Sequence, residues 1–178
     1  MSRTEPGRTS YRVADLAARK PTRFSLSPDP AMRAGLARDL SILGVDGLSF
    51  RGEIRPIGRH DWELRAELSA RVVQACIVTL EPVTTAIRED VVRRYLHDLP
   101  EPDAEETEMP EDDTVEPLPE VIDLLTVLTE ALALALPLYP RAEGADAALP
   151  AAEPVEKPFA GLADLLRGKG ETPSGTDL

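Results

Sequence analysis

The chain offers few side chains of the kinds that carry out acid–base, nucleophilic or metal chemistry. Its two histidines, His60 and His97, lie outside any motif such as HExxH, and no serine stands in a GxSxG context. No glycine-rich phosphate loop is present either. Adjacent acids occur at 105–106 and 112–113, but we expect that segment to be too flexible to hold an acid and a base in register. The sequence therefore favours a protein that is not an enzyme.

The single cysteine, Cys76, excludes an internal disulfide. It lies on the apolar side of the alternating stretch VVQACIVTLEPV, which predicts a small buried thiol. One thiol does not supply the four ligands of a structural zinc site, and nothing nearby suggests the low pKa that a redox thiol needs. We predict neither a metal nor any other cofactor.

Arginine dominates the basic residues, because only three of the twenty are lysines. Its planar guanidinium can bind two phosphate oxygens at once. Several arginines fall on the polar sides of three predicted strands, and a meander would gather them on one surface. The candidate RNA-binding residues are Arg51, Arg55, Arg65, Arg71, Arg88, Arg93 and Arg94.

Such a surface would bind phosphate with salt-dependent affinity, and its arginines should be replaceable without unfolding the protein. Aromatic residues do not alternate with the arginines, so base stacking is not predicted. One alternative is a solvated face balanced by Glu53, Glu63 and Glu67. Another is that the arginine content reflects codon usage in a GC-rich genome.

The net charge of −12 is unevenly distributed. Thirteen acids and no Lys or Arg occur between residues 98 and 140, whereas residues 1–97 carry 16 basic and 12 acidic residues. The acidic part, 98–117, is rich in proline and poor in hydrophobic residues, which predicts a disordered loop. This loop is either a solubilising linker or a functional element that binds a basic protein, or that holds the molecule's own basic face when RNA is absent.

The elements that would position these side chains follow from the periodicity. Strands are predicted at 23–27, 47–57, 62–80 and 83–96. The second half of 62–80 should be covered on both faces, and a slip in the pattern of 83–96 near Glu89-Asp90 suggests a bulge or a bend. Helices are predicted at 29–43, between an Asp29 cap and Gly44, and at 123–136, between an Asp123 cap and a proline. The second helix is apolar nearly all round and should be buried. The fold class is α+β, a curled antiparallel meander packed with a buried apolar helix and one further helix.

We expect a flexible N-terminus at 1–10 and a single α+β domain at 11–140, with the disordered loop inside it. Residues 141–178 should form a linker, a short amphipathic helix at 158–167 and a disordered tail. Phe159, Leu162 and Leu166 share one side of that helix and are candidate partner-binding residues. The N-terminus is polar and the longest apolar run is shorter than the ~20 residues of a membrane span, so a cytoplasmic protein is expected.

Three segments, in order, resemble the YceD-like large ribosomal RNA subunit accumulation family. They are VVQACIVTLEPV, then the acidic loop with IDLLTVLTEALALALPLYP, and finally KPFAGLADL. The resemblance covers about residues 15–168. Members often carry Cys-x-x-Cys at the end of the central strand and further cysteine after the buried helix. Here Cys76 matches the first position, Thr79 replaces the second, and 140–156 has no cysteine, so any metal binding by the family's cysteines would be lost.

The resemblance implies a role in accumulation of 23S ribosomal RNA and brings no catalytic residues. We therefore expect a non-enzymatic factor in large-subunit biogenesis that binds precursor RNA or an early assembly intermediate. The main alternative is a protein-only adaptor, or chaperone, that holds a basic ribosomal protein through its acidic loop. A nuclease or RNA-modifying enzyme is a more distant alternative. Neither a membrane nor DNA is expected as a partner.

Overall fold

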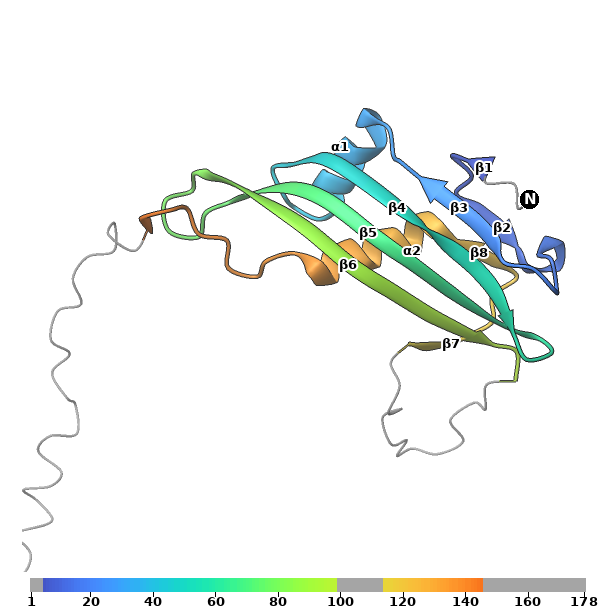
Figure 1. Cartoon of the computed structure of the whole chain (residues 1–178). Coiled ribbons are helices and arrows are strands. Elements are labelled where there is room, and N and C mark those ends of the chain that lie inside the picture. The colour runs from blue at the N-terminus through green and yellow to red at the C-terminus, as the bar shows by residue number, and fades with distance from the viewer. Residues whose placement is uncertain (1–4, 99–113, 146–178) are drawn as a thin grey trace, which may run out of the picture.

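The computed structural model describes residues 5–98 and 114–145, which form an α+β fold. The main sheet has six strands in the order β1-β3-β4-β5-β6-β7, and a second sheet pairs β2 with β8. The described residues also form two α-helices and one short 3-10 helix, η1 (Figure 1). The elements are β1 (Glu5–Pro6), β2 (Ser10–Arg12), η1 (Val13–Asp15), β3 (Thr22–Leu26), α1 (Pro30–Asp39), β4 (Gly44–Ile57), β5 (Asp61–Ala75), β6 (Pro82–Leu96), β7 (Val115–Pro117), β8 (Val121–Asp123) and α2 (Leu124–Ala135).

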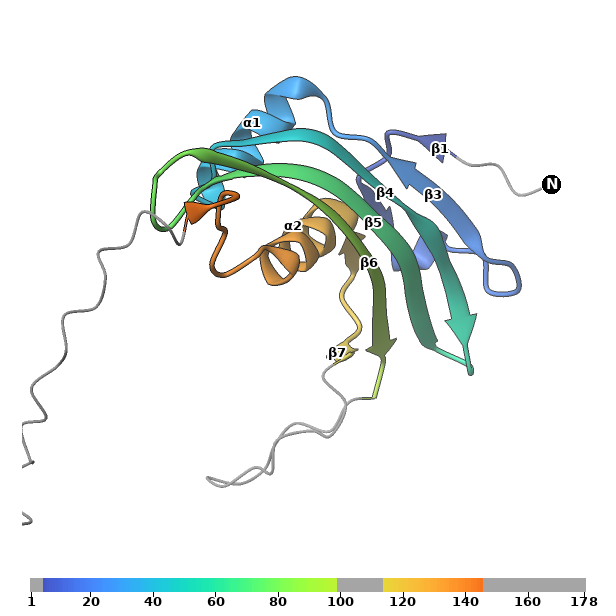
Figure 2. The ribbon, with the colours of Figure 1, turned by 60° about the vertical axis from the view of Figure 1, so that its left-hand side comes forward.

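The predicted meander is confirmed, since β3, β4, β5 and β6 pair antiparallel in sequence order. The short strands β1 and β7 add to its two edges in parallel. In Figure 2 the long strands arch over α2, which lies against one side of the sheet. We call that side the inner face and the opposite side the outer face.

The helix starts follow their predicted caps. The Asp29 carboxylate accepts a hydrogen bond from the Met32 N–H at 2.8 Å, and Asp123 does the same for Leu125 at 2.8 Å. The predicted end of the first helix at Gly44 is wrong. Ser41 turns the chain out of α1 with φ of 54°, and Gly44 already begins β4.

Two predictions about the long strands are also wrong. Strand β5 ends at Ala75, not at residue 80, and Ile77 is exposed because the chain turns there. The pairing of β5 with β6 passes through Glu89 and Asp90 without a shift, so the bulge, one of the two alternatives predicted there, is absent. The irregularity occurs instead in β4, between Val45 and Gly47.

The ordered region is larger than the predicted domain at three places. Strands β1 and β2 begin within the expected flexible N-terminus, and β7 occupies the end of the expected disordered loop. After α2, the Pro140 carbonyl accepts a hydrogen bond from Ile77 and Ala145 is buried. The predicted loop residues 99–113 and the predicted helix at 158–167 lie outside the described residues.

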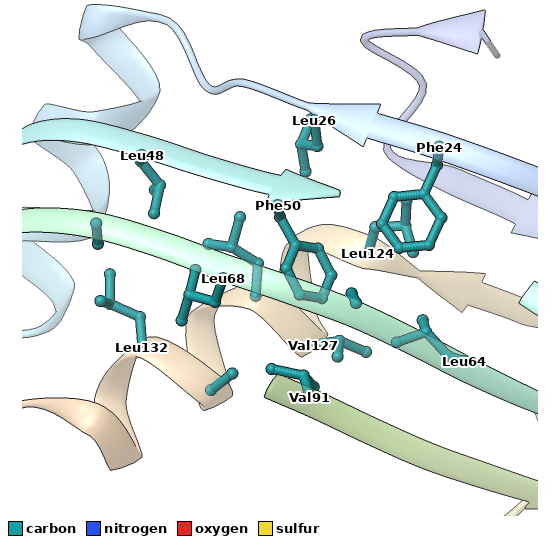
Figure 3. Packing of buried hydrophobic residues seen from close by; sticks show 14 of the residues in the cluster. Phe24, Leu26, Leu48, Phe50, Leu64, Leu68, Val91, Leu124, Val127 and Leu132 are labelled. Atoms are coloured by element: carbon teal, nitrogen blue, oxygen red, sulfur yellow. The ribbon is translucent and has the colours of Figure 1, made fainter. Parts of the chain in front are cut away.

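The core lies between the inner face and α2 (Figure 3). Phe24 and Phe50 pack with their ring centroids 5.5 Å apart. Gly52 lies opposite Ala66, and a side chain at position 52 would overlap the Arg65 carbonyl oxygen, so the strands approach closely here. On α2 the buried residues have helical spacing: Leu124, Val127, Leu128, Ala131 and Leu132.

The helix α2 is only partly covered, although its sequence is apolar nearly all round. Leu128 and Leu132 are fully buried, but the side chain of Leu134 is 81% exposed. The expectation of an all-round buried helix is therefore wrong for one side of α2. The sheet covers one face of the helix, and the described chain leaves the other open.

Candidate functional site

The register of the sheet gathers six of the seven predicted arginines on the outer face. Successive residues of a strand point to opposite sides, so each row of paired residues shares one face. One such row across β4, β5 and β6 consists of Arg55, Glu63 and Arg94, and another consists of Ser49, Ser69 and Arg88. The six outer-face arginines are Arg51, Arg55, Arg65, Arg71, Arg88 and Arg94.

Arg93 is the exception, and its inclusion among the candidate RNA-binding residues is wrong for this surface. It neighbours Arg94 in β6 and therefore points to the inner side, opposite Leu64. There its guanidinium lies 3.2 Å from Glu116 and 3.6 Å from Glu130. Arg93 thus ties β7 and α2 to the sheet.

Glu63 anchors three arginines at one end of the outer face. The residue is 3% exposed, and Glu63 is the one charged residue in the described part of the chain that is buried. Its carboxylate lies 2.6 Å from Arg55, also contacts Arg65, and lies 3.5 Å from Arg94. The hydrogen bond from Arg65, with help from Arg55, lowers the pKa of Glu63 although burial acts against it.

This cluster corrects the expectation that the outer-face arginines can be replaced without cost to stability. Removal of Arg55 and Arg65 would leave the buried Glu63 carboxylate with Arg94 alone. Sequence reasoning placed Glu63 only as a balancing surface charge. The alternation of the three strands could have indicated this cluster, because it places Glu63 among arginines of β4, β5 and β6.

The other end of the outer face holds two arginines above small residues. A hollow of about 470 Å³ lies between Arg71 and Arg88. Along the described chain, neither these two side chains nor Arg51 forms an ion pair. The outer-face floor of the hollow consists of Gly47, Ser49, Ser69 and Ala86.

Between these two ends the outer face carries charges of both signs. Arg51 lies opposite Glu67, which in turn lies opposite Asp90, and Arg23 forms an ion pair with Glu53 at 3.6 Å. A broader hollow of about 700 Å³ lies over these residues. The outer face is therefore a mixed surface in its middle, and Arg71 and Arg88 at this end form no ion pair with any described residue.

The free arginine pair can bind an anion, because each guanidinium offers several N–H donors in one plane. The small floor between them leaves room for a phosphate group without a bulky side chain in the way. The aromatic side chains of the four meander strands lie on the inner face, at Phe24, Phe50, Trp62 and Tyr95. The surface thus offers contacts to a nucleic-acid backbone and not to stacked bases.

Cys76 is a buried thiol, as predicted, at the turn after β5. Its sulfur accepts hydrogen bonds from the N–H groups of Val78 and Thr79 at 3.4 Å and of Ala142 at 3.3 Å. The hydroxyl and N–H of Thr79, then the other N–H groups, lower the pKa of the thiol to about 6. The expectation that nothing nearby lowers this pKa is therefore wrong.

The structure brings together two histidines that are far apart in sequence. The rings of His60 and His97 lie 5.5 Å apart, and the His97 N–H donates to the Asp61 carboxylate at 2.9 Å. Within the described ranges no group of three or more His, Cys, Asp or Glu residues is arranged to hold a metal ion. The candidate partner-binding residues Phe159, Leu162 and Leu166 lie outside those ranges.

A comparison with protein families matches residues 64–166 to a family model. The matching model is described as "Large ribosomal RNA subunit accumulation protein YceD". It covers more than half of the 178 residues, from β5 through α2 and beyond. The chain belongs to the YceD family. Membership ties it to accumulation of large-subunit ribosomal RNA, as the resemblance predicted.

The YceD match includes Arg65, Arg71, Arg88 and Arg94 of the outer face, whereas Arg51 and Arg55 lie before it. Searches of curated proteins and of solved structures gave no match. No helix within residues 5–98 and 114–145 is long and apolar enough to cross a membrane.

Proposed function

We propose that this YceD-family protein is a non-enzymatic, cytoplasmic factor that supports 23S ribosomal RNA accumulation by holding precursor RNA on its outer face. The main support for this proposal is the register of β4, β5 and β6, which places six of their arginines on one side of the sheet. Among them Arg51, Arg71 and Arg88 form no ion pair with any described residue. The proposal needs no cofactor, because phosphate contact is electrostatic.

The arrangement of charge supports contact with RNA despite the net charge of −12. Arginines outnumber acids among the outward residues of β3 to β6, so the outer face is locally positive. The acids that create the negative total are concentrated between residues 98 and 130. Since the whole molecule repels RNA while this face attracts it, we expect modest affinity that falls steeply with salt.

The partner can be identified in cells by crosslinking and sequencing of the bound RNA. Wild-type protein should crosslink to precursor 23S RNA, and Arg71→Ser with Arg88→Ser should remove most of that signal. Arg12→Ser with Arg38→Ser is the matched control, because it removes two exposed arginines that lie away from the outer face. Crosslinking to a basic ribosomal protein, without RNA, would contradict the proposal and support the adaptor alternative.

A further inference from the structure

A groove runs between the outer edge of β6 and the open side of α2. It has a volume of about 440 Å³. Backbone of β6 forms one wall, and the last turns of α2 form the other. The residues that matter for its chemistry are Glu89, Asp90, Val92, Thr114, Ala131 and Leu134.

The β6 wall of this groove is a free strand edge. The backbone N–H of Arg94 donates to the Thr114 carbonyl at 2.7 Å, and the Leu96 carbonyl accepts from the Leu118 N–H at 2.9 Å. The backbone N–H and C=O groups of the even-numbered residues of β6 therefore point away from β5. Strand β7 pairs only with Arg94 to Leu96. By alternation the N–H and C=O groups of Val92 and Asp90 also point outward. No described strand pairs with them.

The α2 wall is apolar, and Leu134 is its exposed residue, whereas Ala131 is buried. Leu134 is 81% exposed, and Ala131 lies one turn before it on the same wall. An exposed leucine beside a free strand edge is a combination that soluble proteins usually cover or use for binding. A strand added to β6 would bring alternate side chains over this wall.

The charge around the groove is negative. Glu89 lines it from the inner side of β6 and Asp90 from the outer side, and neither forms an ion pair with described residues. The one arginine of the lining, Arg93, is already shared by Glu116 and Glu130. An occupant with basic side chains is thus favoured over an acidic one.

We propose that this groove binds a basic, extended segment of another polypeptide, which adds as a strand to the free edge of β6. Its backbone would hydrogen-bond to Val92 and Asp90, one apolar side chain would cover Leu134 on the inner side, and its basic side chains, which alternate with the apolar ones, would lie on the outer side beside Asp90. The groove is at the sheet edge and not on the outer face, so the inference does not depend on RNA binding.

The test is fluorescence anisotropy of the full-length protein with a labelled peptide of alternating lysine and valine. Leu134→Gln should weaken binding by about tenfold or more, which corresponds to about 1.4 kcal/mol. Leu138→Gln is the matched control, because Leu138 is 85% exposed but does not line the groove. A peptide with methylated amide nitrogens on alternate residues should not bind, since it cannot add as a strand.

Four outcomes would overturn the proposal. They are equal losses from Leu134→Gln and Leu138→Gln, undiminished binding of the methylated peptide, tighter binding after Lys157, Arg167 and Lys169 are changed to Glu, and a dimer that Leu134→Gln dissociates. The third would show the chain's own C-terminal segment in the groove, and the fourth would show a second copy. RNA binding by the Leu134→Gln variant should be unchanged, which separates this inference from the proposed function.

Discussion

At the scale of single residues, Glu63 and Cys76 show how one buried group can depend on its surroundings. Glu63 holds guanidinium groups from β4, β5 and β6 together on the outer face. Cys76 joins the turn after β5 to the segment after α2 through its sulfur. In both cases the neighbours stabilise the charged form of the buried group: arginines stabilise the Glu63 carboxylate, and hydrogen-bond donors stabilise the Cys76 thiolate.

Glu63→Gln should destabilise the protein by about 2 kcal/mol, because three arginines lose a charged acceptor in a buried position. Chemical unfolding at neutral pH measures this, with Glu67→Gln, an exposed acid of the same face, as control. The pKa of Glu63 is lowered on folding, so its contribution is present above the unfolded value of about 4.3. It is lost as pH falls through the folded value, and Glu63→Gln should flatten that acid arm.

The Cys76 thiol should ionise with a midpoint near pH 6 in the folded protein. The unfolded pKa is about 8.5, so stability from this group should rise between these two values and be lost as pH falls through the lower one. Thiolate ultraviolet absorbance during a pH titration measures the midpoint. Cys76→Ala should remain folded and lose the signal, and a wild-type midpoint near 8.5 would contradict the hydrogen-bonded thiolate.

At the scale of elements, most of the architecture could be predicted from periodicity. Alternation located β4, β5 and β6, and the Asp29 and Asp123 caps fixed where the two helices begin. The misses share a cause, because local pattern does not contain tertiary contacts. The apolar stretch after Ala75 reads as strand, yet it turns there to meet Pro140 and Ala142.

The two sides of α2 should respond oppositely to charge. Leu128→Asp should abolish cooperative folding, because it buries an unpaired carboxylate at a fully enclosed position, at a cost of several kcal/mol. Leu134→Asp should leave the protein folded, since that side chain is 81% exposed. Circular dichroism with thermal melting distinguishes them. A cooperative melt of the Leu128→Asp variant would mean that the face contacting the sheet is not the core.

At the scale of the whole molecule, charge is divided between surfaces. The outer face of the sheet is rich in arginine, whereas acids line the β6–α2 groove and the sequence between residues 98 and 130. The sequence predicted the arginine surface but not its division into a Glu63 cluster and a free pair. That division depends on register and on which side chains lie within ion-pair distance, neither of which composition contains.

The central claim is that the outer face binds RNA through free arginines, and the salt dependence of RNA affinity tests it most directly. Full-length protein and precursor 23S RNA are titrated over a range of salt starting at about 50 mM. Replacement of Arg51, Arg71 and Arg88 by Ser should lower affinity and flatten the slope of log affinity against log salt by about two to three units, since each lost phosphate contact contributes about 0.7 to 0.9. The same change at Arg12, Arg19 and Arg38 should leave the slope near the wild-type value. Equal slopes for both triple variants, or no binding by the wild type at the lowest salt, would contradict direct RNA contact by this face.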